Sequence, residues 1–406
     1  MGATRTRRLL GSALVVLSVA GLASSPTEAA EAVKVGVLAP LTGVYSIVGD
    51  RGVKGVELAA AEINAAGGVL GRPLEIIARD DETNPEVALR QVRRLILQDK
   101  VVAVVGPLHG GAAIAVSNET KRSQVLQFPF AAVEDLTTVS CQPFLWRITA
   151  SASQTSRGGA ELAKQLNLGS WATISSDFSY GRSVINYFVE HLKDITPSVT
   201  IATQAWPKLG EEDFGAYIND ILKSQPKGLY VGLFAADLVR FVKQAKAFGL
   251  LDRMTVLFDS GGSHEVLKSL GNDAPFGQWA SERYNFLASS SEANRKFVAA
   301  FNKKYNLYPD MIAHDGYASL KFFAAAAEKA KSVDPRKVAP ALAGLRLETP
   351  KGVVWLRPED HQTVQPTIWG KVQRSAQYPF PILTDFVVVP AERVTLPVER
   401  SGQGCR

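Results

Sequence analysis

Short apolar runs alternate with amphipathic helical segments from Val33 onwards. Runs rich in valine, isoleucine and leucine, with the length of a buried strand, occupy residues 33–39, 74–78, 101–105 and 125–128. Between them apolar residues recur at helical spacing, as in residues 52–66, where Val53, Val56, Ala60 and Ile63 share one face. This alternation predicts an α/β fold built on a parallel sheet.

A second series of the same kind begins near Gln154. Strands are expected at residues 171–175, 200–205, 228–233 and 255–258, with helices at 154–166, 181–193, 211–223 and after residue 235. The chain then returns to helices at 292–305 and 315–331, and short strands follow Pro350. Two successive series predict two lobes, each with its own doubly wound sheet, joined by short crossovers of the kind that a hinge requires.

The first 32 residues have the composition of a secretory signal peptide. Arg5, Arg7 and Arg8 form a basic region, residues 9–23 form an apolar region, and Ala30-Glu31-Ala32 fits a cleavage site. The mature chain is therefore expected to start near Val33. No later segment reaches the roughly 18 apolar residues of a membrane helix, so we expect an exported, soluble protein.

Composition and charge narrow the class of protein further. The 406 residues are 46% hydrophobic and 21% charged, which is typical of a globular chain and favours two domains over one. The formal charge of +6 is spread without a long basic tract, so no nucleic-acid partner is expected. In an oxidising compartment Cys141 and Cys405 could form a disulfide that ties down the C-terminus, and two free thiols are the alternative.

Glycines, aromatic residues and small side chains gather where the predicted strands end. Ligands of open α/β sheets bind beyond these carboxyl ends. Gly110 and Gly111 open a helix directly after a buried strand, and the free N–H groups of such a helix attract anions, although tight packing alone can also require glycine. The candidate ligand-binding residues are Tyr45, His109, Gly110, Gly111, Ala131, Ala132, Tyr180, Phe234, Asp259, Ser260 and Gly261. Together they predict a cleft between the lobes that closes on a small molecule.

No arrangement of residues indicates an enzyme. The sequence Asp259-Ser260-Gly261-Gly262 is similar to that around the nucleophile of chymotrypsin-like serine proteases, but here it ends a parallel strand and has no base or orienting group assigned to it. The five histidines show no metal-ligand spacing, and His191 and His361 are expected at the surface. Phosphate-binding and dinucleotide-binding loops are absent from the sequence. We therefore expect no catalysis, no metal and no cofactor.

Four segments carry a resemblance to a known family. They are VKVGVLAPLTGVYSIVGDRGVKGVELAAAEINAAGGVLGRPLEIIARDDETNPEVA and VVAVVGPLHGG, followed by DFSYGRSV and GLYVGLFAADLVRFVKQAKAFGL. Through them residues 33–331 resemble the leucine/isoleucine/valine-binding family of periplasmic solute-binding proteins, which serve ABC importers. The resemblance implies a type I periplasmic binding protein fold, in which two Rossmann-like lobes are joined by three crossovers. It divides the chain into a signal peptide (1–32), a first lobe (33–151 and 284–346) and a second lobe (152–283 and 347–406).

The resemblance also implies a ligand site that differs from that of amino-acid binders. In such proteins a serine receives the ligand carboxylate and a threonine helps to hold the amino acid. These positions correspond here to Gly110 and Ala132, with Ala131 supplying a carbonyl group. Tyr180 keeps a tyrosine of the site, whereas Phe234 replaces a second aromatic residue that is usually tyrosine.

The acidic partner of an amino-acid ligand is also changed. Its position corresponds to Ser260, with Asp259 one residue away. Because these departures remove hydroxyl groups and an acidic group, we expect a more apolar pocket. Phe130 and the two aromatic residues of the site suit an aromatic or otherwise apolar carboxylate, whose charged group would bind the N–H groups of residues 110–112.

The expected function follows from the fold and the site together. The protein is interpreted as a monomeric, non-enzymatic periplasmic subunit that closes on its ligand and then docks on the permease of an ABC importer. A branched-chain or other amino acid is the alternative ligand. A module that senses a ligand and reports to a receptor is the alternative function.

Overall fold

Two separate sheets hold the strands of the two predicted series. In this computed structural model, which describes residues 1–4, 31–400 and 405, the first sheet has the order β2-β1-β3-β4 and all its pairs are parallel. Its strands and their helices are β1 (Val33–Ala39), α1 (Ser46–Ala65), β2 (Leu74–Asp80), α2 (Pro85–Leu97), β3 (Ala103–Val105), α3 (Gly110–Ser123) and β4 (Leu126–Phe128). The basic and apolar regions of the predicted signal peptide lie outside the described residues.

The second sheet has seven strands in the order β14-β13-β9-β8-β7-β5-β6. Strands β5 to β9 are parallel, whereas β13 pairs antiparallel with both β9 and β14. Its elements are α4 (Ala152–Leu166), β5 (Ser170–Ile174), α5 (Ser179–Ile195), β6 (Thr200–Ala205), α6 (Gly215–Lys223), β7 (Gly228–Val231), α7 (Ala235–Ala247), β8 (Thr255–Phe258), α8 (His264–Leu270), β9 (Trp279–Ser281), β13 (Thr367–Gln373) and β14 (Ile382–Val389). The predicted α/β class is confirmed, and β9 is a strand that the sequence pattern did not predict.

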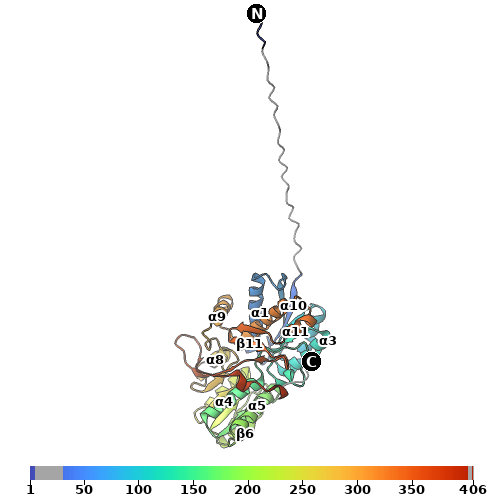
Figure 1. Ribbon diagram of the computed structural model, residues 1–406. Coiled ribbons are helices and arrows are strands. Elements are labelled where there is room, and N and C mark those ends of the chain that lie inside the picture. Colours follow the sequence, from blue (N-terminus) through green and yellow to red (C-terminus); the bar gives the residue numbers. More distant parts are fainter. Residues whose placement is uncertain (5–30, 401–404, 406) are drawn as a thin grey trace.

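The chain returns to the first sheet before it ends on the second. Helices α9 (Glu292–Tyr305), α10 (Met311–Ala330) and α11 (Pro335–Leu342) share the apolar core of the first sheet. A small antiparallel sheet, β10 (Arg346–Thr349), β11 (Gly352–Leu356) and β12 (Thr363–Val364), follows, and Val354 and Leu356 are buried in the same core. Figure 1 shows α1, α10, α11 and β11 in one part of the molecule and α4, α5 and β6 in the other.

We call the first sheet with α1–α3, α9–α11 and β10–β12 the first lobe, and the second sheet with α4–α8 the second lobe. Three segments cross between them, at residues 129–151, 282–291 and 365–366. The packing of β11 favours a boundary near residue 365, later in the chain than the expected residue 346. Among the described residues, no helix combines the length and apolar character that crossing a membrane requires.

Glycines allow α1 to approach α10 closely. A Cβ atom at Gly55 would lie 2.0 Å from the Ala313 carbonyl oxygen, and one at Gly316 would lie 2.5 Å from the Gly52 carbonyl oxygen. Phe130 packs against Gly52 and is fully buried. Phe130 was expected to face the ligand, whereas it is not among the residues of the pocket lining, and its ring fills the space that this glycine leaves.

Two helices begin earlier than the sequence pattern predicted. Helix α1 starts at Ser46 rather than at residue 52, and Gly49 interrupts the helical signal there. Helix α10 starts at Met311 rather than at residue 315 because Asp310 caps it, with its side chain accepting hydrogen bonds from the backbone N–H groups of residues 312 and 313.

Candidate ligand-binding site

A small pocket lies where the strand ends of the two lobes meet. The lining residues are Tyr45, Leu108, Gly110 and Ala132 from the first lobe and its crossover, Phe178, Tyr180 and Phe234 from the second lobe, and Arg283 from the crossover after β9. Five of these eight were predicted from the sequence. The lining is mostly apolar and aromatic with one charged side chain, which is the usual composition of a site that binds a small molecule.

Aromatic rings from both lobes pack against one another at the pocket. Tyr45 of the first lobe meets Phe234 of the second edge-on, with ring centroids 5.4 Å apart. Phe178 stacks on His109 at 5.5 Å and also contacts Tyr180 at 6.0 Å. Because aromatic faces favour flat apolar partners, these walls suit a planar or compact apolar group.

The N-terminus of α3 is less available to an anion than expected. His109 caps the helix, and its Nδ1 atom accepts the backbone N–H of Ala112 at 3.2 Å. Burial lowers the pKa of His109, which favours the neutral ring that this acceptor role requires. One of the three N–H groups expected to bind the carboxylate is therefore already used, and the cap carries no positive charge.

Gly110 is required by the close approach of the two lobes. A Cβ atom at this position would lie 2.8 Å from Ser179 Oγ, at the start of α5. A serine side chain, which the family resemblance places here, does not fit unless its neighbours move. Gly111 lies next to His109 outside the lining, and Ala131 packs in a small apolar cluster with Val133.

Asp259 is held behind the pocket wall by two tyrosines. Its Oδ2 atom accepts the Tyr180 hydroxyl at 3.0 Å and its Oδ1 atom accepts the Tyr230 hydroxyl at 3.1 Å. Burial raises the pKa of Asp259, while these two hydrogen bonds and the charge of Arg283 oppose that rise. Asp259 does not line the pocket, so its carboxylate is committed to the protein rather than to a ligand.

The two residues after Asp259 are also set back from the lining. Ser260 has a backbone φ of +53°, donates its N–H to Ser281 Oγ at 3.0 Å, and its hydroxyl lies 3.3 Å from the Tyr180 hydroxyl. Gly261 sits against Phe258, since a Cβ atom there would lie 2.6 Å from that side chain. The predicted Asp259–Gly261 turn therefore supports the Tyr180 wall from behind.

Arg283 is the charged residue of the lining, and the sequence reasoning missed it. Arg283 is buried, with 5% of the residue exposed. Its Nε atom lies 4.0 Å from Asp315 Oδ2 and has no hydrogen-bond partner among the described residues. Arg283 follows β9, whose sequence Trp279-Ala280-Ser281 lies between Gln278 and Glu282 and forms no apolar run. An arginine beside the end of a strand in the same sheet as Asp259 is the signal that could have found it.

A buried charge cluster lies behind Arg283. Asp315 accepts the Thr149 hydroxyl and lies 3.2 Å from His314 Nδ1, and burial lowers the pKa of His314 to about 4, so that its ring is neutral near pH 7. Lys351 donates to the Arg283 carbonyl oxygen at 3.0 Å and to the Gln365 side chain. Two cations, Arg283 and Lys351, therefore act on the Asp315 carboxylate.

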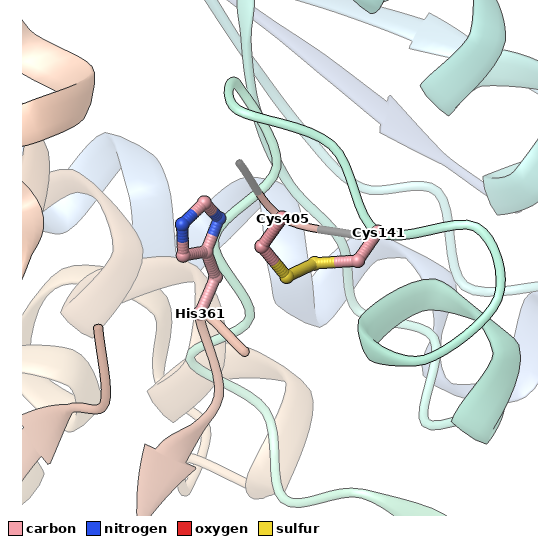
Figure 2. Close-up of side chains that lie close together, drawn as sticks. All are labelled: Cys141, His361 and Cys405. Carbon is pink, nitrogen blue, oxygen red and sulfur yellow. A yellow bond between two sulfur atoms is a disulfide. The ribbon is translucent and has the colours of Figure 1, made fainter. Parts of the chain in front are cut away.

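The two cysteines are joined in the structure. Cys141 and Cys405 form a disulfide with a Cα–Cα distance of 4.7 Å, and it ties the C-terminal end to the first lobe (Figure 2). His361 lies beside it, buried against Trp146 at a ring distance of 3.6 Å and hydrogen-bonded through Nδ1 to the Leu145 carbonyl oxygen at 2.9 Å. Its expected surface position is therefore wrong.

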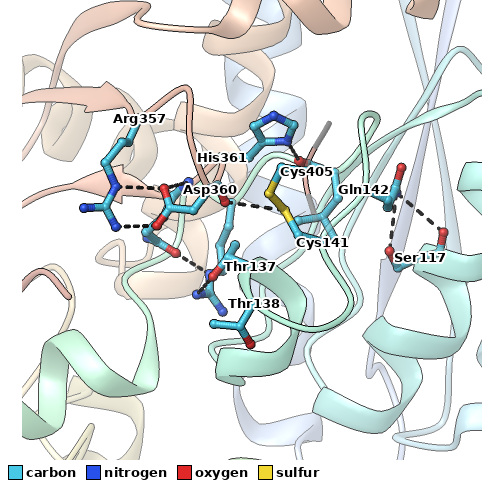
Figure 3. Close-up of a disulfide and its surroundings, with 12 residues drawn as sticks. Ser117, Thr137, Thr138, Cys141, Gln142, Arg357, Asp360, His361 and Cys405 are labelled. Atoms are coloured by element: carbon cyan, nitrogen blue, oxygen red, sulfur yellow. Dashed lines mark hydrogen bonds and ion pairs between the residues drawn. A yellow bond between two sulfur atoms is a disulfide. The ribbon is translucent and has the colours of Figure 1, made fainter. Parts of the chain in front are cut away.

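The disulfide also changes how this group of side chains is interpreted. The ligand atoms of the two cysteines and His361 lie within 4.8 Å of one another, which would suit a metal ion if both thiols were free. With the sulfurs bonded to each other, no thiolate is available to hold one. Figure 3 shows the neighbouring Arg357–Asp360 ion pair, which fixes the segment that carries His361.

Comparisons with known proteins agree with this architecture. A model of the periplasmic binding protein family matches residues 32–377, and the chain belongs to that family. It is 26% identical over 356 residues to a Leu/Ile/Val-binding protein homolog 7 of Brucella abortus, covering 83% of this chain and 87% of that protein. It is also 26% identical over 352 residues to a leucine-, isoleucine-, valine-, threonine- and alanine-binding protein of Pseudomonas aeruginosa, covering 86% and 91%.

A solved structure supports the same conclusion. The solute-binding protein of an ABC transporter from Rhodopseudomonas palustris BisB5, in complex with 3,4-dihydroxybenzoic acid, is 25% identical with a TM-score of 0.78, covering 88% of this chain and 97% of that one. The fold is thus that of a type I periplasmic binding protein of the Leu/Ile/Val-binding family. The chain is a substrate-binding protein of an ABC transporter, a class that works in transport and resides in the periplasm.

Proposed function

We propose that this protein captures a small carboxylate that lacks an amino group and has an aromatic or other apolar body, and delivers it to the permease of an ABC importer. One observation carries the proposal. The charged residue of the lining is Arg283, a cation, whereas the neighbouring acid Asp259 is committed to two tyrosine hydroxyls. A carboxylate finds its partner in this pocket, and an ammonium group does not.

The electrostatics of the site favour this class over amino acids. A guanidinium binds a carboxylate through parallel N–H donors, and the attraction is strong where water is excluded. The ammonium group of an α-amino acid would lie close to the same guanidinium and would need an acidic or carbonyl partner of its own. Apolar contacts with Leu108, Phe178 and Phe234 then suit the remainder of the ligand.

The comparisons support two ligand classes, of which the site favours one. The Rhodopseudomonas palustris BisB5 protein holds 3,4-dihydroxybenzoic acid, an aromatic acid without an amino group. The Pseudomonas aeruginosa relative is named for leucine, isoleucine, valine, threonine and alanine. Arg283 and the withdrawn Asp259 favour the aromatic acid, and aliphatic amino acids remain the alternative that the experiment must test.

Hinge closure is the proposed mechanism of capture. Because the lining comes from both lobes, a bound molecule bridges them and shifts an equilibrium between open and closed forms. The closed monomer then presents one surface, formed by both lobes, to the permease. The signal peptide directs this monomer to the periplasm and is removed near Val33.

A thermal-shift screen of the mature protein tests the proposal. The panel pairs benzoate, hydroxybenzoates and short aliphatic acids with leucine, isoleucine and valine, and adds benzamide as a neutral analogue of benzoate. A ligand at 100 times its dissociation constant stabilises the protein by about 2.7 kcal/mol, which raises the unfolding midpoint measurably. Stabilisation by benzoate-like acids but not by benzamide supports the proposal. Stabilisation by the amino acids alone contradicts it.

A further inference from the structure

A buried ion pair joins the two lobes away from the pocket. Arg51 of α1, in the first lobe, donates through Nη2 to Glu265 Oε1 of α8, in the second lobe. The two side chains are 7% and 13% exposed, so the contact is largely removed from water. Arg51 Nε and Nη1 have no hydrogen-bond partner among the described residues. This pair is separate from the pocket lining.

The surroundings of the pair come from both lobes. His264 Nε2 lies 3.3 Å from Glu265 Oε1, Asp50 lies 3.9 Å from Arg51 Nε, and the buried Asp310 and the more distant Lys268 also act on the pair. The His264 ring packs against aromatic residues of a crossover and of the β13–β14 loop, Phe286 at 5.7 Å and Phe380 at 5.3 Å.

The carboxylate of the pair is firmly ionised. Burial alone would raise the pKa of Glu265, but the neighbouring His264 ring and the charge of Arg51 lower it to about 2. The Glu265 carboxylate is therefore ionised near pH 7. Separation of the lobes would break the contact between Arg51 and Glu265, because each is fixed on its own helix.

We infer that Arg51 and Glu265 form an interlobe latch that stabilises the closed form and thereby sets ligand affinity without touching the ligand. Closure brings both charges out of water, and each then needs the other, so the closed form is favoured only when both are present. Since affinity depends on the population of the closed form, loss of either partner weakens binding of any ligand that closes the lobes. This inference rests on the proposed function in one respect: some ligand must close the cleft.

Single and double variants test the latch. Arg51→Met and Glu265→Gln each leave one buried charge unpaired, so each is expected to weaken ligand affinity about tenfold or more. The double variant removes both charges. Its loss of binding free energy is expected to be smaller than the sum of the losses in the two single variants. Lys296→Met is the matched control, because Lys296 pairs with Glu292 within α9 of the first lobe, and neither of these residues contacts Arg51 or Glu265.

The measurement is calorimetric titration of each variant with both benzoate and L-leucine, beside small-angle scattering of the ligand-free and ligand-saturated forms. Testing both compounds separates the latch from the ligand class, since the same factor is expected for whichever compound the wild type binds. Glu265→Gln is nearly isosteric, and its ligand-free unfolding midpoint shows whether it folds. A larger radius of gyration in the single variants supports the latch. Unchanged affinities and superimposable scattering curves overturn it.

Discussion

The ends of β8 and β9 are neighbours in the second sheet, yet the charged residues that follow them differ in how far their hydrogen-bonding groups are already used within the protein. Asp259 follows β8, and its two oxygens accept hydroxyls from Tyr180 and Tyr230. Arg283 follows β9 and lines the pocket, and the one ion pair of its side chain among the described residues is with Asp315 at 4.0 Å. Both are buried, so exposure does not distinguish them. The difference lies in the hydrogen-bonding capacity that each retains for a ligand.

The contrast between Asp259 and Arg283 indicates which kind of buried charged group can determine the charge of a ligand. A buried charge whose donors or acceptors are already used contributes to the fold and to the wall behind the pocket. A buried charge with unused donors needs a partner, and a ligand can supply it. By this criterion we expect the pocket to select an anion, although an acid and a base lie at adjacent strand ends.

Removal of the Arg283 charge should produce the largest effect. Arg283→Met is expected to weaken binding of a carboxylate ligand ~100-fold, because the ligand charge would be buried without its partner. Arg283→Lys keeps the charge but loses the parallel donors, and should bind with intermediate affinity. Calorimetric titration with benzoate measures both. Arg374→Met is the control, since Arg374 is exposed and donates to Asn272 far from the lining. Equal benzoate affinity of Arg283→Met and wild type would contradict the proposal that Arg283 binds the ligand carboxylate.

The cluster behind Arg283 should reveal itself in the pH dependence of stability. Burial lowers the pKa of Lys351 to about 8, while Asp315 opposes the shift, and an unfolded lysine has a pKa of about 10.4. Between these values the unfolded chain binds more protons than the native one, so the free energy of unfolding rises with pH. From pH 7 to pH 10 wild type should gain about 2 kcal/mol relative to Lys351→Met.

Urea unfolding at several pH values measures this difference. Subtraction of the Lys351→Met curve removes the contribution of the buried tyrosines, which lose protons in the same alkaline range. Parallel curves for the two proteins would show that burial beside Arg283 does not lower the pKa of Lys351.

Much of the fold could be predicted because its signals are local. Apolar runs and helical periodicity located most strands and helices, and the residues that follow the apolar runs included Tyr45, Gly110, Ala132, Tyr180 and Phe234 of the lining. The rule that ligands bind beyond strand ends then sufficed to bring them together. Strand β9 lies between polar residues and forms no apolar run, which is why the residue after it was missed.

The remaining errors have long-range causes. The state of Asp259 depends on Tyr230, which lies inside a strand and 29 residues away. His361 was expected at the surface, but a tryptophan from the first crossover covers its ring. His191, also expected there, is 7% exposed beside Glu161. Such pairings depend on which elements the fold brings together, and the local sequence does not encode them.

Removal of the Tyr230 hydroxyl should have the smallest effect, and it should act on Asp259 rather than on Arg283. Tyr230→Phe leaves Asp259 Oδ1 without its donor in a fully buried site, and is expected to reduce the free energy of unfolding by about 1–2 kcal/mol. Urea unfolding measures the loss. Tyr217→Phe is the control, because its ring packs on the second core and its hydroxyl makes no hydrogen bond with the described residues.

The affinity of the same variant decides whether the two strand ends are independent. Tyr230 does not line the pocket, and Tyr180 still donates to Asp259 after the substitution. Benzoate affinity should therefore change less than about twofold, although the protein is less stable. If Tyr230→Phe instead lost as much affinity as Arg283→Met, the hydrogen bonds of Asp259 would control the pocket. The ligand's charge would then be set by both strand ends together, and not by Arg283 alone.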